Sequence, residues 1–195
     1  MKVTIISAST RILRRSHSVA LFLKNQIELR GHFAEILDLA AYQFPVFDEV
    51  LAKQPDPSPA LLEFSHKIRH SDAVLFISPE YNGSYTSALK NAVDYLKDQE
   101  FAQKVIGSVS VSAGMLGGIR AALNMQELAL AVGGFVLPQM LLVSEVGKRF
   151  SETGGLLDQG FQPKVDVFLD AFLWISEAVV EKKHRTEVHF SAKTA

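Results

Sequence analysis

The chain has 195 residues, no cysteine and a formal net charge of −1, from 20 basic and 21 acidic side chains. This length fits one α/β domain, and the charge lacks the strong basic excess of a protein whose main partner is nucleic acid. The absence of cysteine excludes disulfides, thiolate metal sites and a cysteine nucleophile, so any redox chemistry must depend on a bound cofactor.

The apolar segments of the chain show no pattern of export or membrane insertion. The run at residues 3–6 is too short for a secretory signal. No run approaches the roughly 18 apolar residues that a membrane span needs. We therefore expect a cytoplasmic protein that has no membrane contact.

The apolar pattern predicts strands that alternate with helices. Short apolar runs are typical of buried parallel strands, and apolar residues at helical spacing indicate amphipathic helices. In chain order, the predicted elements are a strand at 3–6, a helix from 19 to about 31, a strand at 34–39, a helix at 61–70, a strand at 73–77, a helix from 87 to about 98, a strand at 105–111, a helix at 119–132, a strand at 135–143 interrupted by Pro138, and a helix at 165–179. Such alternation implies an α/β fold with a parallel sheet and right-handed crossovers.

The connections between these elements do not divide the chain into separate units. Residues 41–59 carry four prolines and residues 144–160 carry four glycines, so both predict irregular connections. There is no internal repeat, low-complexity tract or linker. We expect one domain over residues 1–183 and a polar tail at 184–195, with fraying from about Lys182.

Residues 7–18, which follow the first strand, are rich in hydroxyl and arginine side chains. A helix start offers unpaired N–H groups, and hydroxyls with the Arg11 guanidinium suit the oxygens of a phosphate. Neither a nucleoside-triphosphate loop nor a Rossmann glycine pattern is present. From these residues alone two interpretations stay open: a phosphate site, or a helix capped by Ser16 with solvated arginines.

Residues 78–91 predict a ligand-binding loop between a buried strand and a helix. The strand should stop at Pro79, which has no N–H for the sheet, and Asn82–Gly83 tolerates the positive φ of a sharp turn. The residues that can cap the next helix are Ser84, Thr86 and Ser87. Open α/β sheets bind their ligands at this end of the strands.

Three segments together resemble motifs of one family. Pro79–Tyr85 (Pro-Glu-Tyr-Asn-Gly-Ser-Tyr) resembles the loop of the NAD(P)H-dependent FMN reductases, which belong to the flavodoxin-like superfamily and include quinone, azo and chromate reductases. Ser9–Ser16 is similar to the family's Gly-Ser-x-Arg-…-Ser loop for the FMN 5′-phosphate, and Ser112–Arg120 to its Gly-Gly-x-x-Gly-Gly-x-Arg loop. The departures are Ala8 and Ala113 in place of glycine, and Thr86–Ser87 in place of Pro-Gly.

The resemblance implies a flavodoxin-like fold, a five-stranded parallel sheet in the order 2-1-3-4-5 with helices on both faces. It also implies an FMN cofactor, NADPH or NADH as electron donor, a small-molecule acceptor, and a homodimer or homotetramer. The helix starting near Ser87 and the segment Phe44–Phe47 are the candidate subunit contacts. The cofactor-binding residues that it implies are Ser9, Arg11, Ser16, His17, Ser18, Pro79, Glu80, Tyr81, Asn82, Gly83, Ser112, Gly114 and Gly117.

Within this set the expected roles differ. The flavin ring gains negative charge when reduced, so the fixed backbone amides of Asn82 and Gly83 suit its edge, and Tyr81 would pack beside it. For Glu80, shaping of the loop or of a subunit contact and a plain exposed carboxylate are both open. No catalytic side chain and no metal site is expected, and Arg120 receives no catalytic role.

The resulting hypothesis is an FMN-dependent oxidoreductase. It would transfer hydride from NAD(P)H to FMN and then reduce a quinone or similar small acceptor in a ping-pong cycle. The alternatives are a flavodoxin-type electron carrier and a flavin-binding regulatory module with little turnover. Near-neutral charge favours the enzyme over an acidic carrier, while the acceptor and the choice between NADH and NADPH stay open.

Two other patterns receive structural interpretations. His66 and His70 lie four residues apart on a predicted helix, but no third ligand is evident, so a solvated helix face is expected. Phe168 and Phe172 of the last helix are expected in the core.

Overall fold

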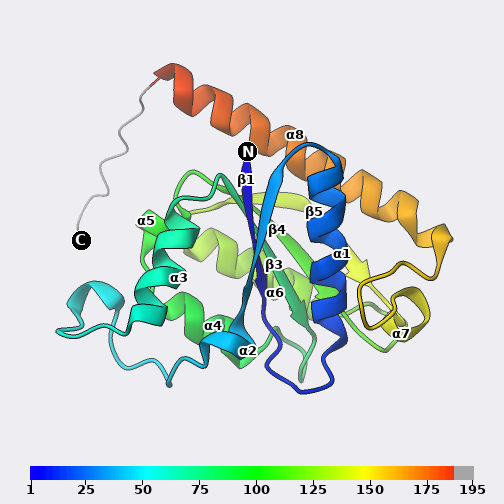
Figure 1. The fold of residues 1–195 in the computed structure, drawn as a ribbon, viewed down its shortest axis with the longest axis horizontal. Coiled ribbons are helices and arrows are strands. Elements are labelled where there is room, and N and C mark those ends of the chain that lie inside the picture. Colours follow the sequence, from blue (N-terminus) through cyan, green and yellow to red (C-terminus); the bar gives the residue numbers. More distant parts are fainter. Residues whose placement is uncertain (187–195) are drawn as a thin grey trace.

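The computed structural model describes residues 1–186, and its centre is one parallel sheet (Figure 1). The five strands are β1 (Lys2–Ser7), β2 (Phe33–Asp38), β3 (Ala73–Pro79), β4 (Val105–Val111) and β5 (Phe135–Val143). Their order is β2-β1-β3-β4-β5, and every neighbouring pair is parallel. The flavodoxin-like order predicted from the resemblance is therefore confirmed.

Helices cover both faces of this sheet. They are α1 (Arg15–Leu29), α2 (Leu39–Tyr42), α3 (Pro59–Arg69), α4 (Ser87–Asp94), α5 (Asp98–Phe101), α6 (Ile119–Ala131), α7 (Val146–Arg149) and α8 (Gln162–Thr186), with short 3₁₀ turns at Leu51–Lys53 and Gln159–Phe161. One buried cluster joins α1 and α8 to the sheet, and the other joins α3, α4 and α6 to its opposite face. Two separate cores thus hold the strands between two helical layers.

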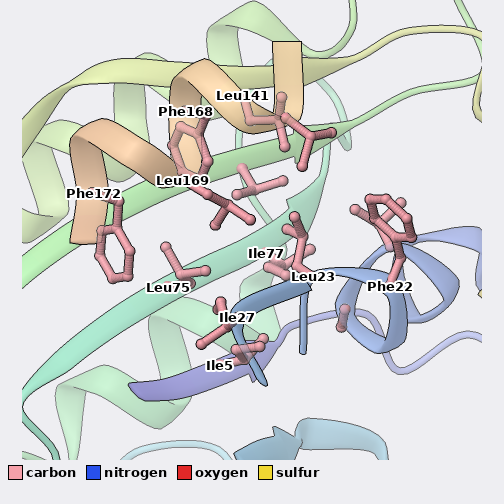
Figure 2. Packing of buried hydrophobic residues seen from close by; sticks show 14 of the residues in the cluster. Ile5, Phe22, Leu23, Ile27, Leu75, Ile77, Leu141, Phe168, Leu169 and Phe172 are labelled. Carbon is pink, nitrogen blue, oxygen red and sulfur yellow. The ribbon is translucent and has the colours of Figure 1, made fainter. Parts of the chain in front are cut away.

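Figure 2 shows the packing of the first cluster. Side chains of α1 and α8 converge on the sheet from the same side, among them Leu23, Ile27, Phe168, Leu169 and Phe172. Phe168 and Phe172 are 2% and 0% exposed, which confirms them as core residues. The buried face of α8 therefore packs against β4 and β5.

The first helix begins four residues earlier than expected. α1 starts at Arg15, so Ser16 and Ser18 lie in its first turn instead of in the preceding loop. Both side chains are buried, at 2% and 3% exposure. Tertiary packing outweighs the weak local preference of serine here, and it brings Ser16 to the helix start as part of the helix.

The helix expected from 87 to about 98 is divided. α4 ends at Asp94 and α5 begins at Asp98. Between them the backbone N–H of Lys97 donates to the side chain of Glu100 at 3.0 Å. Thr86 caps α4, with its Oγ1 accepting from the Leu89 N–H at 3.2 Å. The expected cap is thus confirmed, while the single long helix was wrong.

Three further boundaries differ from the expectation. The connection at 41–59 contains α2 and a 3₁₀ turn, and the connection at 144–160 contains α7. α8 is longer than expected and continues to Thr186, so residues 182–186 do not fray as expected. The single domain over residues 1–183 and the tail at 184–195 stay predictions, and residues 187–195 lie outside the described part.

The interruption predicted at Pro138 is present in β5. The register with β4 shifts between Ile106 and Ser108, whose partners are Val136 and Met140. The amide of Gln126 donates to the carbonyls of Leu137 and Pro138 at 3.0 and 3.1 Å. A side chain from α6 therefore supplies hydrogen bonds where the ladder is broken.

Candidate functional site

Three loops follow the carboxyl ends of β1, β3 and β4, and they enclose a cavity of about 320 Å³. Its lining includes seven of the residues predicted to bind the cofactor: Ser9, Arg11, Ser16, Pro79, Glu80, Tyr81 and Ser112. The lining is completed by Leu13, Arg14, Arg15, Val111, Ala113 and Val146. Segments that are 30 or more residues apart in sequence thus share one concave site at the edge of the sheet that typically binds ligands.

Side-chain contacts bind the first two loops to each other. Ser9 Oγ and Tyr81 Oη lie 3.0 Å apart, and the Arg11 guanidinium lies 5.8 Å from the centroid of the Tyr81 ring. Thr86 Oγ1 donates to the carbonyl of Ala8 at 2.9 Å. Thr86 stands where the resembling family often has proline, and here its hydroxyl holds the α4 start against the first loop.

The start of α1 offers hydrogen-bond donors that no capping side chain occupies. Arg14, the residue before the helix, does not cap it with its side chain, so the first-turn N–H groups lack that partner. Ser16 Oγ is buried and has no hydrogen-bond partner within residues 1–186. Leaving a buried hydroxyl unpaired costs about 1–3 kcal/mol, and a bound acceptor such as a phosphate oxygen would relieve that cost. The alternative in which Ser16 caps the helix is wrong.

Sequence reasoning missed the ion pair that holds the first loop. Arg14 donates to Asp38 Oδ1 at 2.8 Å and to the carbonyl of Ser9 at 3.0 Å. Both side chains of the pair are largely buried, at 18% and 23% exposure. The available signal was the position of Asp38 at the end of the second strand, beside Ser7 in register. Arg14 is therefore a positioning residue rather than a solvated cation.

His17 and Ser18 direct their side chains away from this cavity. His17 Nδ1 lies 3.0 Å from Ser7 Oγ and 3.9 Å from Asp38, while Ser18 Oγ donates to the carbonyl of Glu152 at 2.8 Å. Both residues line a neighbouring cavity of about 410 Å³. Burial lowers the pKa of His17, with Arg14 acting in the same direction and Asp38 opposing it, so the environment favours the neutral ring.

The second loop forms a tight turn. The Tyr81 N–H donates to Ser84 O at 2.9 Å, and the Ser84 N–H donates to Tyr81 O at 3.1 Å. Asn82 and Gly83, between them, have φ of 51° and 85°, as their residue types predicted. Their own amides lie outside the two bonds that close the turn, so they can act as donors to a ligand.

An ion pair joins the second loop to the third. Glu80 accepts from Arg120 Nε at 2.9 Å and from the Arg120 backbone N–H, at the start of α6, at 3.2 Å. The Glu80 side chain is 14% exposed. Its carboxylate therefore shapes the loops, and the interpretation as an exposed carboxylate is wrong.

The glycines of the third loop have different structural roles. Gly117 has a φ of 64°, and a Cβ added there would lie 2.9 Å from Leu142 Cβ, so the fold itself requires glycine. Gly114 has no such restriction, and its N–H donates to Ser112 Oγ at 3.0 Å. Neither glycine lines the 320 Å³ cavity, nor do Asn82 and Gly83.

Other candidate features lie away from the three loops. Another cavity, of about 610 Å³, is lined in part by residues of α3, α5 and the 3₁₀ turn at Leu51–Lys53. His66 and His70 lie there with ring centroids 4.0 Å apart and ring planes tilted by 31°. Within residues 1–186 there is no group of three side chains placed to hold a metal ion. No helix in that part of the chain is both long and apolar enough to span a membrane.

The arrangement offers anion binding at one end and neutral donors at the other. Arg11 and Ser16 line the cavity at the first loop and Tyr81 lines it at the second, while the turn at 82–83 follows Tyr81 outside the lining. No paired carboxylates or nucleophile–base pair lines the cavity. Such a site can bind a phosphorylated, flat molecule, and it leaves the reaction chemistry to that molecule.

Comparison with known proteins connects this geometry to a family. The model of the family described as NADPH-dependent FMN reductase matches residues 1–148. The chain is 31% identical to an NAD(P)H-dependent FMN reductase of Pseudomonas aeruginosa over 151 residues, which cover 74% of this chain and 80% of that protein. It is 31% identical to a quinone reductase of Escherichia coli over 134 residues, 66% of this chain and 71% of that protein.

A solved structure agrees with these sequence matches. The flavoenzyme NAD(P)H:(acceptor) oxidoreductase FerB from Paracoccus denitrificans superposes with a TM-score of 0.78 at 26% identity. The superposition covers 91% of this chain and 97% of FerB. The likeness therefore extends over the sheet and both helical layers.

Proposed function

The chain belongs to the NADPH-dependent FMN reductase family, and we propose that it transfers hydride from NAD(P)H to FMN and then reduces a quinone or similar small acceptor. Membership makes it an FMN-dependent oxidoreductase that uses NAD(P)H. The acceptor class is supported by the quinone reductase among its relatives. FMN, when bound, supplies the hydride and electron transfer for which the cavity has no side chain.

We assign the phosphate of FMN to the first loop. The observation that carries this assignment is Ser16 Oγ, which is buried and unpaired within residues 1–186 at the uncapped start of α1. Ser9 and the Arg11 guanidinium line the same cavity and add a neutral donor and a positive charge. The residues present therefore fit the phosphate.

The ring would lie against the second and third loops. The amides of Asn82 and Gly83 are fixed, uncharged donors, and Tyr81 connects them to the phosphate site through Ser9. Glu80 and Arg120 keep the two loops at a constant separation. His17, Ser18, Gly114 and Gly117 remain predicted contacts, and the first two would act through their backbone because their side chains are bonded elsewhere.

Exposed apolar side chains of the first and third loops support a flat, apolar acceptor. Ile12 and Leu13 of the first loop and Met115 and Leu116 of the third are exposed, from 78% to 98%. We propose that nicotinamide and acceptor use the same space in turn, which gives ping-pong kinetics. Parallel double-reciprocal plots are expected, and intersecting plots would contradict this order.

We also propose a homo-oligomer, as the sequence resemblance implies. The two candidate subunit contacts, the helix starting near Ser87 and the segment Phe44–Phe47, are only partly exposed. Phe44 and Phe47 pack on Tyr95 of their own chain at 6.1 and 5.4 Å between ring centroids, which leaves Val46 as the exposed apolar residue of that segment. In α4 the apolar residues Leu89, Ala92 and Val93 are buried, so a contact at this helix would be mostly polar.

The test combines binding with turnover. Purified protein should bind FMN, lose its flavin absorbance when NADPH is added without oxygen, and oxidise many equivalents of NADPH once a quinone is present. Ser16→Ala should weaken FMN binding about tenfold, equivalent to about 1.4 kcal/mol. Failure of the native protein to bind FMN would overturn the function. A single turnover would favour a carrier or a regulatory module.

A matched control separates the phosphate contact from general damage. Ser108 in β4 is also buried and unpaired within residues 1–186, but it does not line the cavity. Ser108→Ala should leave the dissociation constant of FMN unchanged. Equal effects of the two substitutions, or none for Ser16→Ala, would contradict the role of Ser16.

A further inference from the structure

A second cavity, of about 410 Å³, adjoins the cavity assigned to FMN. Its lining includes Ile12, Leu13, Arg14, Arg15, Ser18 and Glu152. Leu13, Arg14 and Arg15 also line the 320 Å³ cavity, so the two cavities meet across the first loop. The volume is within the range of about 300–1,000 Å³ that is usual for small-molecule sites, and a molecule bound there would lie next to the FMN phosphate.

Arg15 and Glu152, both of this lining, form an exposed ion pair. Arg15 Nη2 lies 3.2 Å from Glu152 Oε1, and the two side chains are 44% and 79% exposed. Exposed pairs of this kind contribute little to stability, because water solvates both charges when they separate. Arg14, in contrast, is bound to Asp38 with both side chains largely buried. Arg15 is therefore the guanidinium of this lining that an anionic ligand can engage at small cost.

Glu152 belongs to a loop that packs tightly on α1. Ser18 Oγ donates to the Glu152 carbonyl at 2.8 Å. Gly154 has a φ of 87°, and a Cβ added there would lie 2.9 Å from Leu21 Cβ. The backbone beside the carboxylate is thus held, while the carboxylate itself extends into solvent. Both members of the pair therefore start from fixed positions, one on α1 and one on the loop beside it.

Apolar surface completes the cavity. Ile12 and Leu13 are branched aliphatic residues, yet they remain 98% and 89% exposed. Apolar walls of this kind suit the flat face of an aromatic base, and both residues share the lining with the ion pair. The cavity thus combines an apolar wall, one available guanidinium and one carboxylate.

We propose that this cavity binds the adenosine half of the nicotinamide donor, and that Arg15 and Glu152 determine the choice between NADPH and NADH. The two donors differ only in the 2′-phosphate of that half. At dinucleotide sites in general, an arginine accommodates this phosphate and a carboxylate accepts from the free 2′-hydroxyl. Arg15 takes the first role here and Glu152 the second. The assignment rests on the proposed function, because it presupposes a nicotinamide donor.

The position of the cavity agrees with hydride transfer to FMN. The phosphate of FMN is assigned to the first loop and its ring to the second and third loops. A donor whose nicotinamide stacks on that ring, and whose chain runs back along FMN, brings its adenosine to the first loop. The 410 Å³ cavity adjoins the FMN site at this loop, so it is placed to receive that adenosine.

The charges of the pair predict a preference for NADPH. A phosphate monoester carries up to two negative charges, and it binds a guanidinium through two parallel hydrogen bonds. It therefore competes well with the single charge of Glu152 for Arg15. Glu152 repels the same phosphate, so its charge limits the preference.

Steady-state kinetics with each donor, at saturating FMN and quinone, test both residues. The measured quantity is the KM for NADPH divided by the KM for NADH, which should be below one in the native chain. Arg15→Gln should raise this ratio about tenfold, since a charged hydrogen bond to the phosphate is lost. Glu152→Gln should lower it about threefold, because the repulsion is removed while the amide oxygen still accepts from the hydroxyl.

Arg185→Gln is the matched control for these variants. Arg185 and Glu181 of α8 also form an exposed ion pair, at 3.1 Å, and neither lines the two cavities. The ratio for this variant should equal that of the native chain. Unchanged ratios in Arg15→Gln and Glu152→Gln, or the same change in Arg185→Gln, would overturn the inference alone. A native protein that oxidises neither donor would contradict the proposed function, and this inference with it.

A binding measurement that needs no turnover tests the same contact. The probes are adenosine 2′,5′-bisphosphate and adenosine 5′-monophosphate, which differ only in the 2′-phosphate, titrated calorimetrically into FMN-saturated protein. The native chain should bind the bisphosphate about tenfold more tightly, and Arg15→Gln should bind both probes equally. Equal affinities in the native chain, or a difference that persists in Arg15→Gln, would show that Arg15 does not hold the 2′-phosphate.

Discussion

Arg14 fixes the first loop because its guanidinium bonds to two parts of the chain at once. One nitrogen donates both to the carbonyl of Ser9 in the loop and to the carboxylate of Asp38 at the end of β2. Asp38 also accepts from the Ala40 N–H and so caps α2. A single side chain thus connects the predicted phosphate loop to the rigid sheet. We expect that loss of this connection weakens ligand binding.

Asp38→Asn should weaken FMN binding while the fold is kept. Asparagine still presents an oxygen to the Ala40 N–H, but it removes the charge that orients Arg14. Hydrogen bonds to charged groups contribute about 1.5–3 kcal/mol, so we expect a dissociation constant raised about tenfold or more in a flavin-fluorescence titration.

The control for this change is Glu28→Gln, which breaks the exposed Lys24–Glu28 pair on α1. Such surface pairs contribute only a few tenths of a kcal/mol, so its titration should match that of the native chain. An unchanged affinity in folded Asp38→Asn would show that Arg14 is held without Asp38.

At the scale of elements, the loops were partly predictable from residue types. Asn82–Gly83 and Thr86 adopt the turn and the cap that their chemistry indicates. The Arg14–Asp38 and Glu80–Arg120 pairs were not predictable, because each joins segments that only the folded sheet brings together. Gly117 shows the difference well. The motif predicts a ligand contact at Gly117, which stays a prediction, and the structure adds a backbone reason for glycine that the motif did not indicate.

Gly117→Ala should destabilise the fold even without ligand. The positive φ and the close approach to Leu142 leave no room for a Cβ, and crowding of this kind costs roughly 1–3 kcal/mol. Urea denaturation should show this loss at an unchanged slope.

Gly147→Ala provides a control of opposite sign. Gly147 lies in α7, and a Cβ there would meet nothing within 4 Å. Alanine in place of a helical glycine stabilises by roughly 0.5–1 kcal/mol. If both substitutions had the same sign, the strain assigned to Gly117 would be mistaken.

At the scale of the whole molecule, alternation of strands and helices predicted the parallel sheet but left several strand orders open. The order came from the family resemblance and is confirmed. Neither source could predict how the helices of the two faces approach each other at the amino edge of the sheet. Lys104 lies there, 5% exposed, and donates to the carbonyl of Arg69 at the end of α3.

Lys104 should give the molecule a distinctive dependence of stability on pH. Burial, with a smaller contribution from Lys183 of α8, lowers the pKa of Lys104 to about 8 from its ordinary 10.5. Between these values the unfolded chain holds the proton and the folded chain does not, so the unfolding free energy rises with pH. Below about pH 8 the buried charge persists and its full cost remains.

Lys104→Met removes this charge, so the variant should gain most over the native chain below pH 8, and the difference should shrink as pH rises toward 10.5. Urea denaturation of both proteins at each pH measures this difference in unfolding free energy.

Tyr42, Tyr85 and Tyr95, whose pKa values burial raises, are common to both proteins, so their titration largely cancels in the difference. Lys148→Met, which removes an exposed lysine of α7, should show no such trend. A difference that stays constant from pH 7 to 10 would mean that Lys104 keeps its proton in the folded state, and that water reaches it at the junction of the two layers.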